Sequence, residues 1–581
     1  MEIGVDAGVG NIKVVFVENN EIIDFRTKKT EGRPIEKISK LLGDIKGNHK
    51  LSITGSEGKA ISETFDLQYI NHALSVLEGF QQLYPEARTV FDIGRESSCY
   101  YLFQHTSRGL VLADFSTNSI CGAGGGSLIE KMAARLQFKS LEEFVEKASG
   151  SESAARIAGR CGVFAETDVV HHYQKGIPFE SIASGLCFML ARNFRINVLQ
   201  NKKIISPVYM IGNVSKNKSV VKFLEQLINE RITIPNNQEV IKAYGAARYS
   251  KNLQEISLQE ALEKIYEQKK FIRVQVKPLK LENSLIESKD YEILEQNGEE
   301  KVILSSDSYQ FPKSLECFIG LDVGSVSTKA AILDRNGEFV FGIYRRTSGK
   351  PIDAVIDVIR RTGNYLNEKT EAVILGAGVT GSGRDVAGKI IGADIIRNEI
   401  TAQARGASFF VPDVDTVFEI GGQDSKYIYM ENGMVIDNEM NKACAASTGS
   451  FLEEQARILG ISIEEQFAEL ALKSRNPCSL SEKCAILMAS SLAHYQNSPL
   501  EDKCAGLAYS VCHNYLNRVI GKKPIGKNIV FQGAVAFNKA IVGAFETLLG
   551  KRIHVPIYPH LTGAVGIASI TKEKYQNQEA T

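Results

Sequence analysis

The chain has 581 residues, of which 44% are hydrophobic and 23% charged, a composition typical of a folded globular protein long enough for several domains. Its 68 lysines and arginines balance its 68 aspartates and glutamates, so no basic field indicates a nucleic acid partner. The N-terminus has no basic leader, and no apolar run approaches the roughly 18 residues of a membrane span. We therefore expect a cytoplasmic protein without nucleic acid or membrane partners.

Residues 3–17 have the pattern of two apolar strands around a glycine turn, and the same pattern recurs at residues 319–333. The second copy combines the features of a phosphate cradle. Glycines let backbone N–H groups approach an anion, hydroxyls and a lysine contact its oxygens, and an aspartate suits Mg²⁺. The residues concerned are Asp322, Gly324, Ser325, Ser327, Thr328 and Lys329. A single turn of this kind would favour a plain hairpin.

Two further glycine turns follow apolar strands in each half of the chain. In the second half, the second turn carries Gly421, Gly422, Gln423 and Asp424, and the third carries Gly533 and Ala534. Their first-half counterparts lie at residues 90–99 and 208–214. Each half then closes with a Gly-Ala helix start, at 245–247 and 563–566.

Three glycine turns in this order resemble the actin-like ATPase superfamily, which includes sugar kinases and actin. The resemblance implies an α/β fold of two tandem actin-like ATPase domains with ribonuclease H-like topology. It also implies that the first two turns hold the phosphates of ATP and the third holds the adenosine. Carried over to this chain, Asp322, Gln423 and Asp424 become the catalytic residues, and Gly533 and Ala534 contact the adenosine.

The first half departs from this pattern at its first two turns. It has Val9-Gly10-Asn11-Ile12 in place of the hydroxyls of Ser325 to Thr328, and Arg95-Glu96-Ser97 in place of Gly422-Gln423-Asp424. Arg95 would crowd a backbone that must approach phosphate closely. We therefore expect ATP turnover in the second half and a degenerate or structural first half, although the sequence leaves open whether the first half binds ATP.

Residues 251–316 separate the two halves and have a pattern of their own. Residues 258–266 predict a helix, 271–276 and 301–304 predict strands, and Asn297-Gly298 predicts a turn. We interpret this segment as a small connecting domain or an embellishment. The expected layout is a degenerate ATPase domain at 1–250, the connecting segment at 251–316 and an ATPase domain with intact nucleotide motifs at 317–575.

Two cysteines recur in register in both halves. Cys121 and Cys161 have the same spacing as Cys444 and Cys484, and Cys121 and Cys444 each precede small residues and an amphipathic run. Cysteines kept in register across a duplication favour a joint role, although two buried cysteines per half remain the alternative. A structural zinc site would more often show Cys-x-x-Cys pairs. Four other cysteines lie in sequence contexts that predict core positions: Cys187, Cys317, Cys504 and Cys512. Cys478 is not assigned.

Cys444 with the small residues that follow it, together with residues 378–384 and 398–404, resembles the BadF/BadG/BcrA/BcrD family, which includes the activators of 2-hydroxyacyl-CoA dehydratases. In that family two such domains face each other, and two cysteines from each hold one [4Fe–4S] cluster. The resemblance therefore implies that Cys121, Cys161, Cys444 and Cys484 are the cluster ligands. A thiolate ahead of a helix also has a favourable electrostatic environment for an anionic cluster.

The resemblance implies an ATP-dependent, low-potential electron donor with ATP, Mg²⁺ and a [4Fe–4S] cluster as cofactors. A reduced ferredoxin or flavodoxin would supply the electron. The acceptor would be an iron–sulfur partner, such as a dehydratase or reductase component or a double-cubane cluster protein. A monomer with an internal cluster and a homodimer that shares one both stay open. The alternatives are a small-molecule kinase, such as a sugar kinase, and a nucleotide-dependent regulatory protein without redox work.

Overall fold

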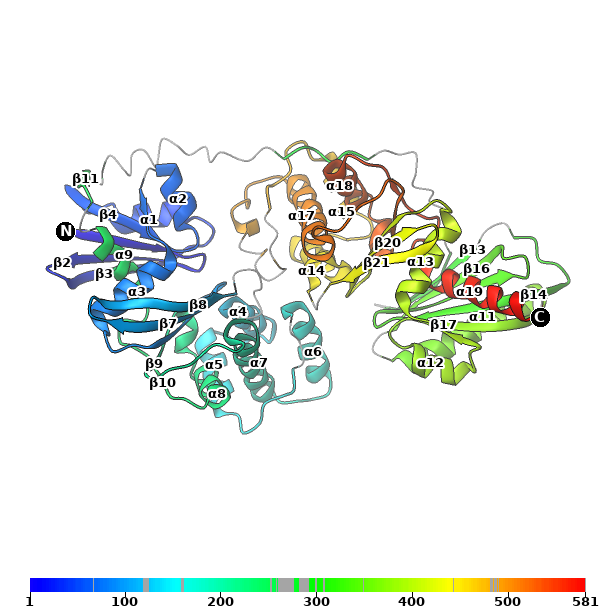
Figure 1. Cartoon of the computed structure of the whole chain (residues 1–581), viewed down its shortest axis with the longest axis horizontal. Helices are drawn as coiled ribbons and strands as arrows, with labels where there is room; N and C mark the ends of the chain where they lie inside the picture. The colour runs from blue at the N-terminus through cyan, green and yellow to red at the C-terminus, as the bar shows by residue number, and fades with distance from the viewer. Residues whose placement is uncertain are drawn as a thin grey trace. The chain divides into compact units, whose positions relative to one another are not determined.

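The computed structural model describes residues 1–65, 67–118, 125–157, 161–250, 253–257, 259, 276–281, 292–297, 300–306, 309–347, 350–441, 444–480, 484, 488 and 491–579. The chain forms two compact units (Figure 1). Unit 1 comprises Met1–Val274 together with Lys483–Asn497, and unit 2 comprises Gln275–Glu482 together with Ser498–Thr581. A short segment of the second half, which carries Cys484, therefore belongs to the first unit.

Unit 1 contains two sheets. The first has the strand order β11-β4-β1-β2-β3, with β5 paired to β4. Its strands are β1 (Glu2–Ala7), β2 (Asn11–Glu18), β3 (Glu21–Lys29), β4 (Asn48–Thr54), β5 (Gln68–Tyr69) and β11 (Ile256–Ser257). The second has the order β10-β9-β6-β7-β8. Its strands are β6 (Thr89–Ile93), β7 (Ser98–Thr106), β8 (Gly109–Thr117), β9 (Val208–Ile211) and β10 (Ile232–Thr233).

Helices accompany both sheets of unit 1. Those of the first sheet and of the region between the sheets are α1 (Pro34–Leu42), α2 (Gly58–Phe65), α3 (His72–Leu83) and α9 (Ile241–Tyr249). Those of the second sheet are α4 (Gly126–Arg135), α5 (Leu141–Gly150), α6 (Gly162–Gln174), α7 (Phe179–Phe194) and α8 (Lys218–Ile228). Phe91, Leu186 and Leu190 belong to the buried apolar core between this second sheet and its helices.

Unit 2 repeats the plan. Its first sheet has the order β12-β13-β16-β15-β14-β17-β18. Its strands are β12 (Glu292–Asn297), β13 (Glu300–Ser306), β14 (Ser314–Val323), β15 (Ser327–Asp334), β16 (Phe339–Arg346), β17 (Glu371–Thr380) and β18 (Ile395–Ile396). Its second sheet has the order β21-β20-β19-β22-β23. Its strands are β19 (Thr416–Ile420), β20 (Ser425–Glu431), β21 (Met434–Met440), β22 (Ile529–Gln532) and β23 (Ile553–His554).

The helices of unit 2 pack on these two sheets. They are α11 (Pro351–Lys369), α12 (Arg384–Ile391), α13 (Glu399–Phe410), α14 (Gly449–Leu459), α15 (Phe467–Lys473), α17 (Leu500–Tyr515), α18 (Lys539–Leu549) and α19 (Thr562–Glu579). The predicted Gly-Ala helix start is α19, which packs closely on α13. A Cβ on Gly566 would lie 1.9 Å from the carbonyl oxygen of Ala402, so only glycine permits this approach of the two helices.

All four sheets share one topology. The first strand pairs antiparallel with the second and parallel with the fourth, as β1 does with β2 and β4, and β14 with β15 and β17. The first predicted glycine turn joins β1 to β2 in unit 1 and β14 to β15 in unit 2, and the second joins β6 to β7 and β19 to β20. The third follows β9 and β22. The strands β12 and β13 of the predicted connecting segment continue the first sheet of unit 2. The predicted helix 258–266 and strand 271–276 fall largely outside the described residues, and the three-part domain layout stays a prediction.

Candidate functional site

The first glycine turn of unit 2 places an acid and a base side by side. Asp322 and Lys329 are paired across β14 and β15, and the Lys329 ammonium lies 3.0 Å from Asp322 Oδ2. The backbone N–H of Gly324 donates to the carbonyl of Ser327 at 2.9 Å, which closes the turn. Asp322 is 1% exposed, so its charge is held in place by Lys329 and not by solvent.

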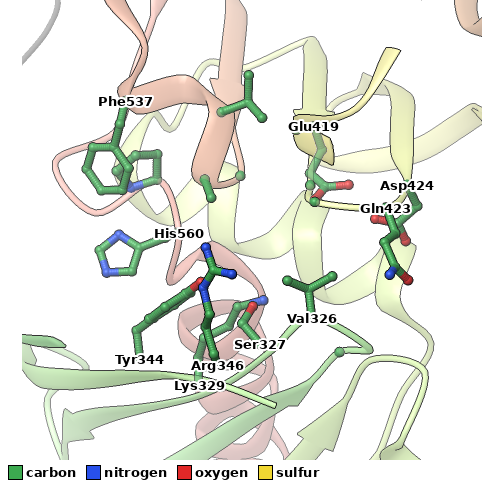
Figure 2. Close-up of a pocket in the computed structure, with 18 of the residues that line it drawn as sticks. Val326, Ser327, Lys329, Tyr344, Arg346, Glu419, Gln423, Asp424, Phe537 and His560 are labelled. Atoms are coloured by element: carbon green, nitrogen blue, oxygen red, sulfur yellow. The ribbon is translucent and has the colours of Figure 1, made fainter. Parts of the chain in front are cut away.

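The second glycine turn faces the first. The Ser325 hydroxyl donates to the side-chain oxygen of Gln423 at 3.2 Å, and a Cβ on Gly422 would lie 3.1 Å from Val326. Together with the third turn they line a cavity of about 470 Å³ (Figure 2). Eleven of the twelve residues predicted to bind or turn over ATP line it: Asp322, Gly324, Ser325, Ser327, Lys329, Gly421, Gly422, Gln423, Asp424, Gly533 and Ala534.

Thr328 is the predicted residue that does not line this cavity. Its side chain is buried, and its hydroxyl lies 3.1 Å from that of Thr347 at the end of β16. The alternation of side chains along β15 explains this, because Ser327 and Lys329 point to one face of the sheet and Thr328 to the other. Thr328 therefore supports the turn from the core side.

A buried lysine holds three carboxylates at the edge of the cavity. The Lys426 ammonium lies 2.9 Å from Glu399 Oε1, 2.8 Å from Glu419 Oε2 and 2.9 Å from Asp424 Oδ2. Burial raises the pKa of Glu419 and of Glu399, and the neighbouring carboxylates raise the pKa of Lys426 well above its ordinary value against the effect of burial. This group keeps a surplus of negative charge even with its lysine, which favours a cation.

One carboxylate oxygen is left for a ligand. Asp322 Oδ1 is buried and has no hydrogen-bond partner among the described residues. Glycines border this carboxylate, since a Cβ on Gly381 would lie 2.7 Å from Oδ1 and a Cβ on Gly563 would lie 2.7 Å from Oδ2. A buried carboxylate in a space kept open by glycine fits Mg²⁺ or its water shell, because hard cations take oxygen ligands.

The other side of the cavity is aromatic. Phe537, His560 and Tyr344 lie opposite Glu419, Gln423 and Asp424 (Figure 2). The rings of Phe537 and Tyr344 lie 5.1 Å and 5.7 Å from the ring of His560. Burial, with a smaller effect from the charge of Lys329, lowers the pKa of His560 to about 3, so this imidazole is neutral at physiological pH. A neutral aromatic wall can stack a flat heterocycle.

The first unit has a smaller counterpart of this cavity, of about 260 Å³, lined by its own three glycine turns. The predicted crowding by Arg95 is visible there. A Cβ on Gly10 would lie 2.9 Å from Cδ of Arg95, so Arg95 covers the first turn where Gly422 leaves room in unit 2. The Arg95 guanidinium also pairs with Glu130 at 2.8 Å.

The four predicted ligand cysteines have different surroundings. Cys161 is the residue immediately before α6, and Cys444 directly precedes a short 3₁₀ helix at Ala445–Ser447. The Arg518 guanidinium donates to Cys444 Sγ at 3.6 Å. Cys484 is buried in the apolar core of unit 1, and Cys121 lies outside the described residues. Within the part of the chain that the structure describes, no group of three or more His, Cys, Asp or Glu side chains is arranged so that it could hold a metal ion.

The remaining cysteine predictions agree with the structure. Cys187, Cys317, Cys504 and Cys512 are all buried, and burial raises the pKa of the first three to about 12. Burial also raises the pKa of Cys512. Cys478, which the sequence left unassigned, is buried too. Its backbone lies against α17, where a Cβ on Gly506 would approach its carbonyl oxygen to 2.4 Å.

The comparison with protein families shows to which family the chain belongs. The profile of the BadF/BadG/BcrA/BcrD ATPase family matches residues 3–250 and again residues 319–570. The chain belongs to this family. Its duplicated match and its four sheets of one topology confirm the predicted fold class of two tandem actin-like ATPase domains. The predicted enzyme class, an ATP-hydrolysing activase, agrees with membership of this family.

Several relatives of this BadF/BadG/BcrA/BcrD family member have names. The 2-hydroxyisocaproyl-CoA dehydratase activator of Clostridioides difficile is 33% identical over 257 residues, which are 43% of this chain and 92% of the activator. The (R)-2-hydroxyglutaryl-CoA dehydratase activating ATPase of Acidaminococcus fermentans is 34% identical over 265 residues, 44% of this chain and 97% of that protein. The crystal structure of component A of the latter dehydratase covers 45% of this chain and 99% of its own, with 31% identity and a TM-score of 0.41.

Six residues of the site were not predicted from the sequence, namely the aromatic residues Tyr344, Phe537 and His560 and three charged residues. Glu399 begins α13, Glu419 lies two residues before the second glycine turn, and Lys426 follows that turn on β20. The alternation of β19 and β20 would have placed Glu419 and Lys426 as cross-strand neighbours, which is how they are paired. No comparable signal joins Glu399 to them.

Among the helices that the structure describes, none is both long and apolar enough to cross a membrane.

Proposed function

We propose that this protein is an ATP-dependent electron donor that reduces an iron–sulfur partner, with ATP hydrolysed in unit 2. The observation that carries the ATPase part is the single cavity lined by all three glycine turns and by Asp322. The redox part is supported by the family and by relatives that are named as dehydratase activators. The acceptor that fits best is a 2-hydroxyacyl-CoA dehydratase-like or benzoyl-CoA reductase-like component.

In unit 2 the residues of the chain would position the phosphates and the attacking water and would stabilise their charge. Lys329, Ser325 and the backbone N–H groups of the first two turns orient the phosphates, and Gln423 with Asp424 positions the attacking water. Asp322 and Glu399 would hold Mg²⁺, which neutralises phosphate charge when bound. Gly533 and Ala534 approach the adenosine, and the aromatic wall with Phe537 and His560 excludes water from its side of the cavity.

The proposed ligands of a [4Fe–4S] cluster are Cys121, Cys161, Cys444 and Cys484. A cluster of this type carries one electron at low potential when bound. Two of these cysteines sit where a thiolate is favoured. The N–H groups at the start of α6 lie next to Cys161, and the Arg518 guanidinium donates to Cys444 at 3.6 Å. The electron would come from a reduced ferredoxin or flavodoxin.

ATP can drive this transfer only if nucleotide binds two conformations of the protein with different affinity. The proposed site of unit 2 spans both sheets, since Asp322 and Lys329 lie on one and Glu419 and Lys426 on the other, so a nucleotide bound there would contact both. A nucleotide held by both sheets favours the conformation in which the two glycine turns face each other. Cys444 comes shortly after strand β21 of the second of these sheets along the chain.

The test of the redox function is an iron and acid-labile sulfide analysis of the full chain purified without oxygen. We expect about four irons per chain for an internal cluster and about two for a cluster shared by a homodimer. Replacement of Cys121, Cys161, Cys444 or Cys484 by alanine should remove the iron. Cys512→Ala is the matched control, because Cys512 is fully buried in the core of unit 2 and should leave the iron content unchanged.

The alternative outcome is equally specific. A chain that stays colourless after reconstitution, hydrolyses ATP and keeps this activity in all four cysteine variants would contradict the electron donor. Phosphorylation of an added sugar or other small molecule by that chain would establish a kinase instead. No described feature favours the kinase over the donor.

A further inference from the structure

The start of α9 in unit 1 and the start of α19 in unit 2 differ in a residue that lies beside the cleft. The two helices correspond residue by residue, because each meets a glycine of the first strand. A Cβ on Gly4 would lie 1.9 Å from the carbonyl oxygen of Ala243, and a Cβ on Gly320 would lie 2.1 Å from that of Ala564. The residue before each alanine is therefore equivalent. It is Lys242 in unit 1 and Gly563 in unit 2.

The Lys242 side chain reaches the floor of the first cleft. Its ammonium lies 3.1 Å from Asp92 Oδ2 on the second sheet, 3.9 Å from Asp6 Oδ2 on the first, and 3.2 Å from His72 Nε2. Its side chain is 10% exposed, and those of Asp6 and Asp92 are 4% and 1% exposed. Lys242 therefore bridges carboxylates from the two sheets of unit 1.

The positive charge of the second cleft comes from a different place. Lys426 on β20 is paired across the sheet with Glu419, and the equivalent pair of unit 1 is Cys99 with Asp92. Unit 1 therefore has Cys99 where unit 2 has Lys426, and Lys242 where unit 2 has Gly563. The positive charge comes from a strand in unit 2 and from the start of a helix in unit 1.

The charges around the two clefts differ in number as well as position. At the start of α13 the asparagine cap Asn398 is followed by Glu399, whereas at the start of α3 the cap Asn71 is followed by His72. Ser97 likewise stands in place of Asp424. Unit 2 therefore sets four carboxylates against two lysines, namely Asp322, Glu399, Glu419 and Asp424 against Lys329 and Lys426. In unit 1 the corresponding ion pairs join two carboxylates, Asp6 and Asp92, to two lysines, Lys13 and Lys242. Glu57, Glu96 and Arg95 also line the cavity.

We propose that the Lys242 ammonium takes, in unit 1, the place that Gly563 leaves open beside Asp322 in unit 2, so that the first cleft admits no divalent cation or metal–nucleotide. Lys242 fills the space beside Asp6 that a cation would need, whereas in unit 2 Gly563 leaves that space open and Asp322 Oδ1 has no hydrogen-bond partner among the described residues. The pKa values support a permanent ion cluster. Burial would raise the pKa of Asp92, but Lys242 and His72 outweigh it and lower that pKa.

The two units would then differ in what connects their sheets. In unit 1 Lys242 connects the two sheets, whereas in unit 2 a bound metal–nucleotide would connect them at the equivalent place. One metal–nucleotide is then bound per chain, and the first cleft stays the same in every nucleotide state. The inference about the first cleft does not depend on ATP hydrolysis or on a cluster, whereas the count of one metal–nucleotide per chain rests on the proposed nucleotide site of unit 2.

The test uses Mn²⁺ as the probe, with EPR detection of the free ion, on the full chain carrying Asp322→Asn to remove the site of unit 2. We expect no specific Mn²⁺ binding to D322N. Adding Lys242→Gly should create a site in unit 1, with Mn²⁺ bound roughly tenfold or more tightly than by D322N and lost again on Asp6→Asn. Mn²⁺ should also raise the unfolding temperature of D322N/K242G and not that of D322N.

A second variant covers the possibility that Lys242→Gly unfolds unit 1. Adding Cys99→Lys to Lys242→Gly returns the charge to the strand position of Lys426 and preserves the count of charges. This variant should fold and bind Mn²⁺ in the D322N background. A folded Cys99→Lys/Lys242→Gly variant that binds no Mn²⁺, or a D322N chain whose Mn²⁺ binding is lost on Asp6→Asn, would overturn the proposal.

Discussion

The hydroxyl of Ser325 donates a hydrogen bond to Gln423 Oε1 at 3.2 Å, and this bond joins the two sheets of unit 2 at their glycine turns. It is exposed, and such a bond contributes only about 0.5–1.5 kcal/mol to stability. The charged oxygens of a phosphate form stronger hydrogen bonds with the same turns. A nucleotide can therefore replace this bond and connect the two sheets itself.

The first prediction concerns Gln423. Gln423→Ala should lower kcat for ATP hydrolysis roughly ten- to a hundredfold with little change in nucleotide affinity, because the residue positions water and does not hold the phosphates. Glu96→Ala is the matched control, since Glu96 occupies the equivalent position in the first cleft. Steady-state hydrolysis by the full chain measures both. An equal loss in the two variants would show that hydrolysis is not confined to unit 2.

Asp322→Asn should abolish metal-dependent hydrolysis, with a loss of roughly a hundredfold or more, because the buried Oδ1, which has no hydrogen-bond partner among the described residues, is the proposed ligand of the cation. The shift of the unfolding temperature by ADP should also cease to depend on Mg²⁺. Asp437→Asn, which removes a surface carboxylate paired with Lys523 in the same unit, should leave both properties unchanged. Full Mg²⁺ dependence in D322N would be incompatible with this role.

Two glycines of α19 should give contrasting phenotypes. A Cβ on Gly563 meets side-chain atoms of Asp322 and Gln403, so Gly563→Ala should weaken nucleotide binding and leave the fold intact. A Cβ on Gly566 meets the carbonyl oxygen and backbone of α13, so Gly566→Ala should cost about 2–3 kcal/mol of stability through overpacking. Calorimetric ADP binding and thermal unfolding separate the two. Unfolding by Gly563→Ala would argue against a space kept open for a ligand.

Lys426→Met should destabilise unit 2 by about 3–5 kcal/mol, because it leaves three carboxylates without their buried counter-charge. The destabilisation of unit 2 by Lys426→Met should become smaller as the pH falls. Burial already raises the pKa of Glu419 and Glu399 above their unfolded values, so the folded state binds more protons and stability rises toward acid. Urea unfolding at pH 6 and pH 8 measures this.

The control for Lys426→Met is Lys523→Met. It breaks the exposed pair with Asp437 and should cost less than about 1 kcal/mol at either pH. A Lys426→Met variant as stable as Lys523→Met, or one that becomes less stable as pH falls, would refute the account of this carboxylate group.

Much of the fold followed from local patterns. The glycine turns and the helix start at 563–566 are short-range signals, and the structure has them where the sequence indicated. The helix start predicted at 245–247 is wrong, because this stretch lies inside α9, which begins at Ile241. Thr328 could not be assigned in the same way, because a motif gives the residue type but only the strand register shows that its hydroxyl points to the core. Arg95 and Ser97 are the residues on which the prediction of a degenerate first half is based, and it stays a prediction.

Long-range relationships were beyond local patterns. The charge that replaces Lys426 in unit 1 comes from Lys242, which is distant in sequence from Asp92 and reaches it only through the packing of α9. The grouping of Lys483–Asn497, with Cys484, into unit 1 is likewise a result of tertiary contacts. His494 of this segment lies 3.8 Å from Glu57, a pair that no spacing rule indicates.

The central claim is that nucleotide in unit 2 acts on a cluster held by the four cysteines, and EPR spectroscopy tests it most directly. The full chain, purified without oxygen and reduced with dithionite, would be compared with and without MgATP. We predict a reduced-cluster signal whose shape and midpoint potential change with MgATP in the wild type and stay constant in D322N. A cluster signal that MgATP leaves unchanged in the wild type, or the absence of any signal after reconstitution, would contradict the account.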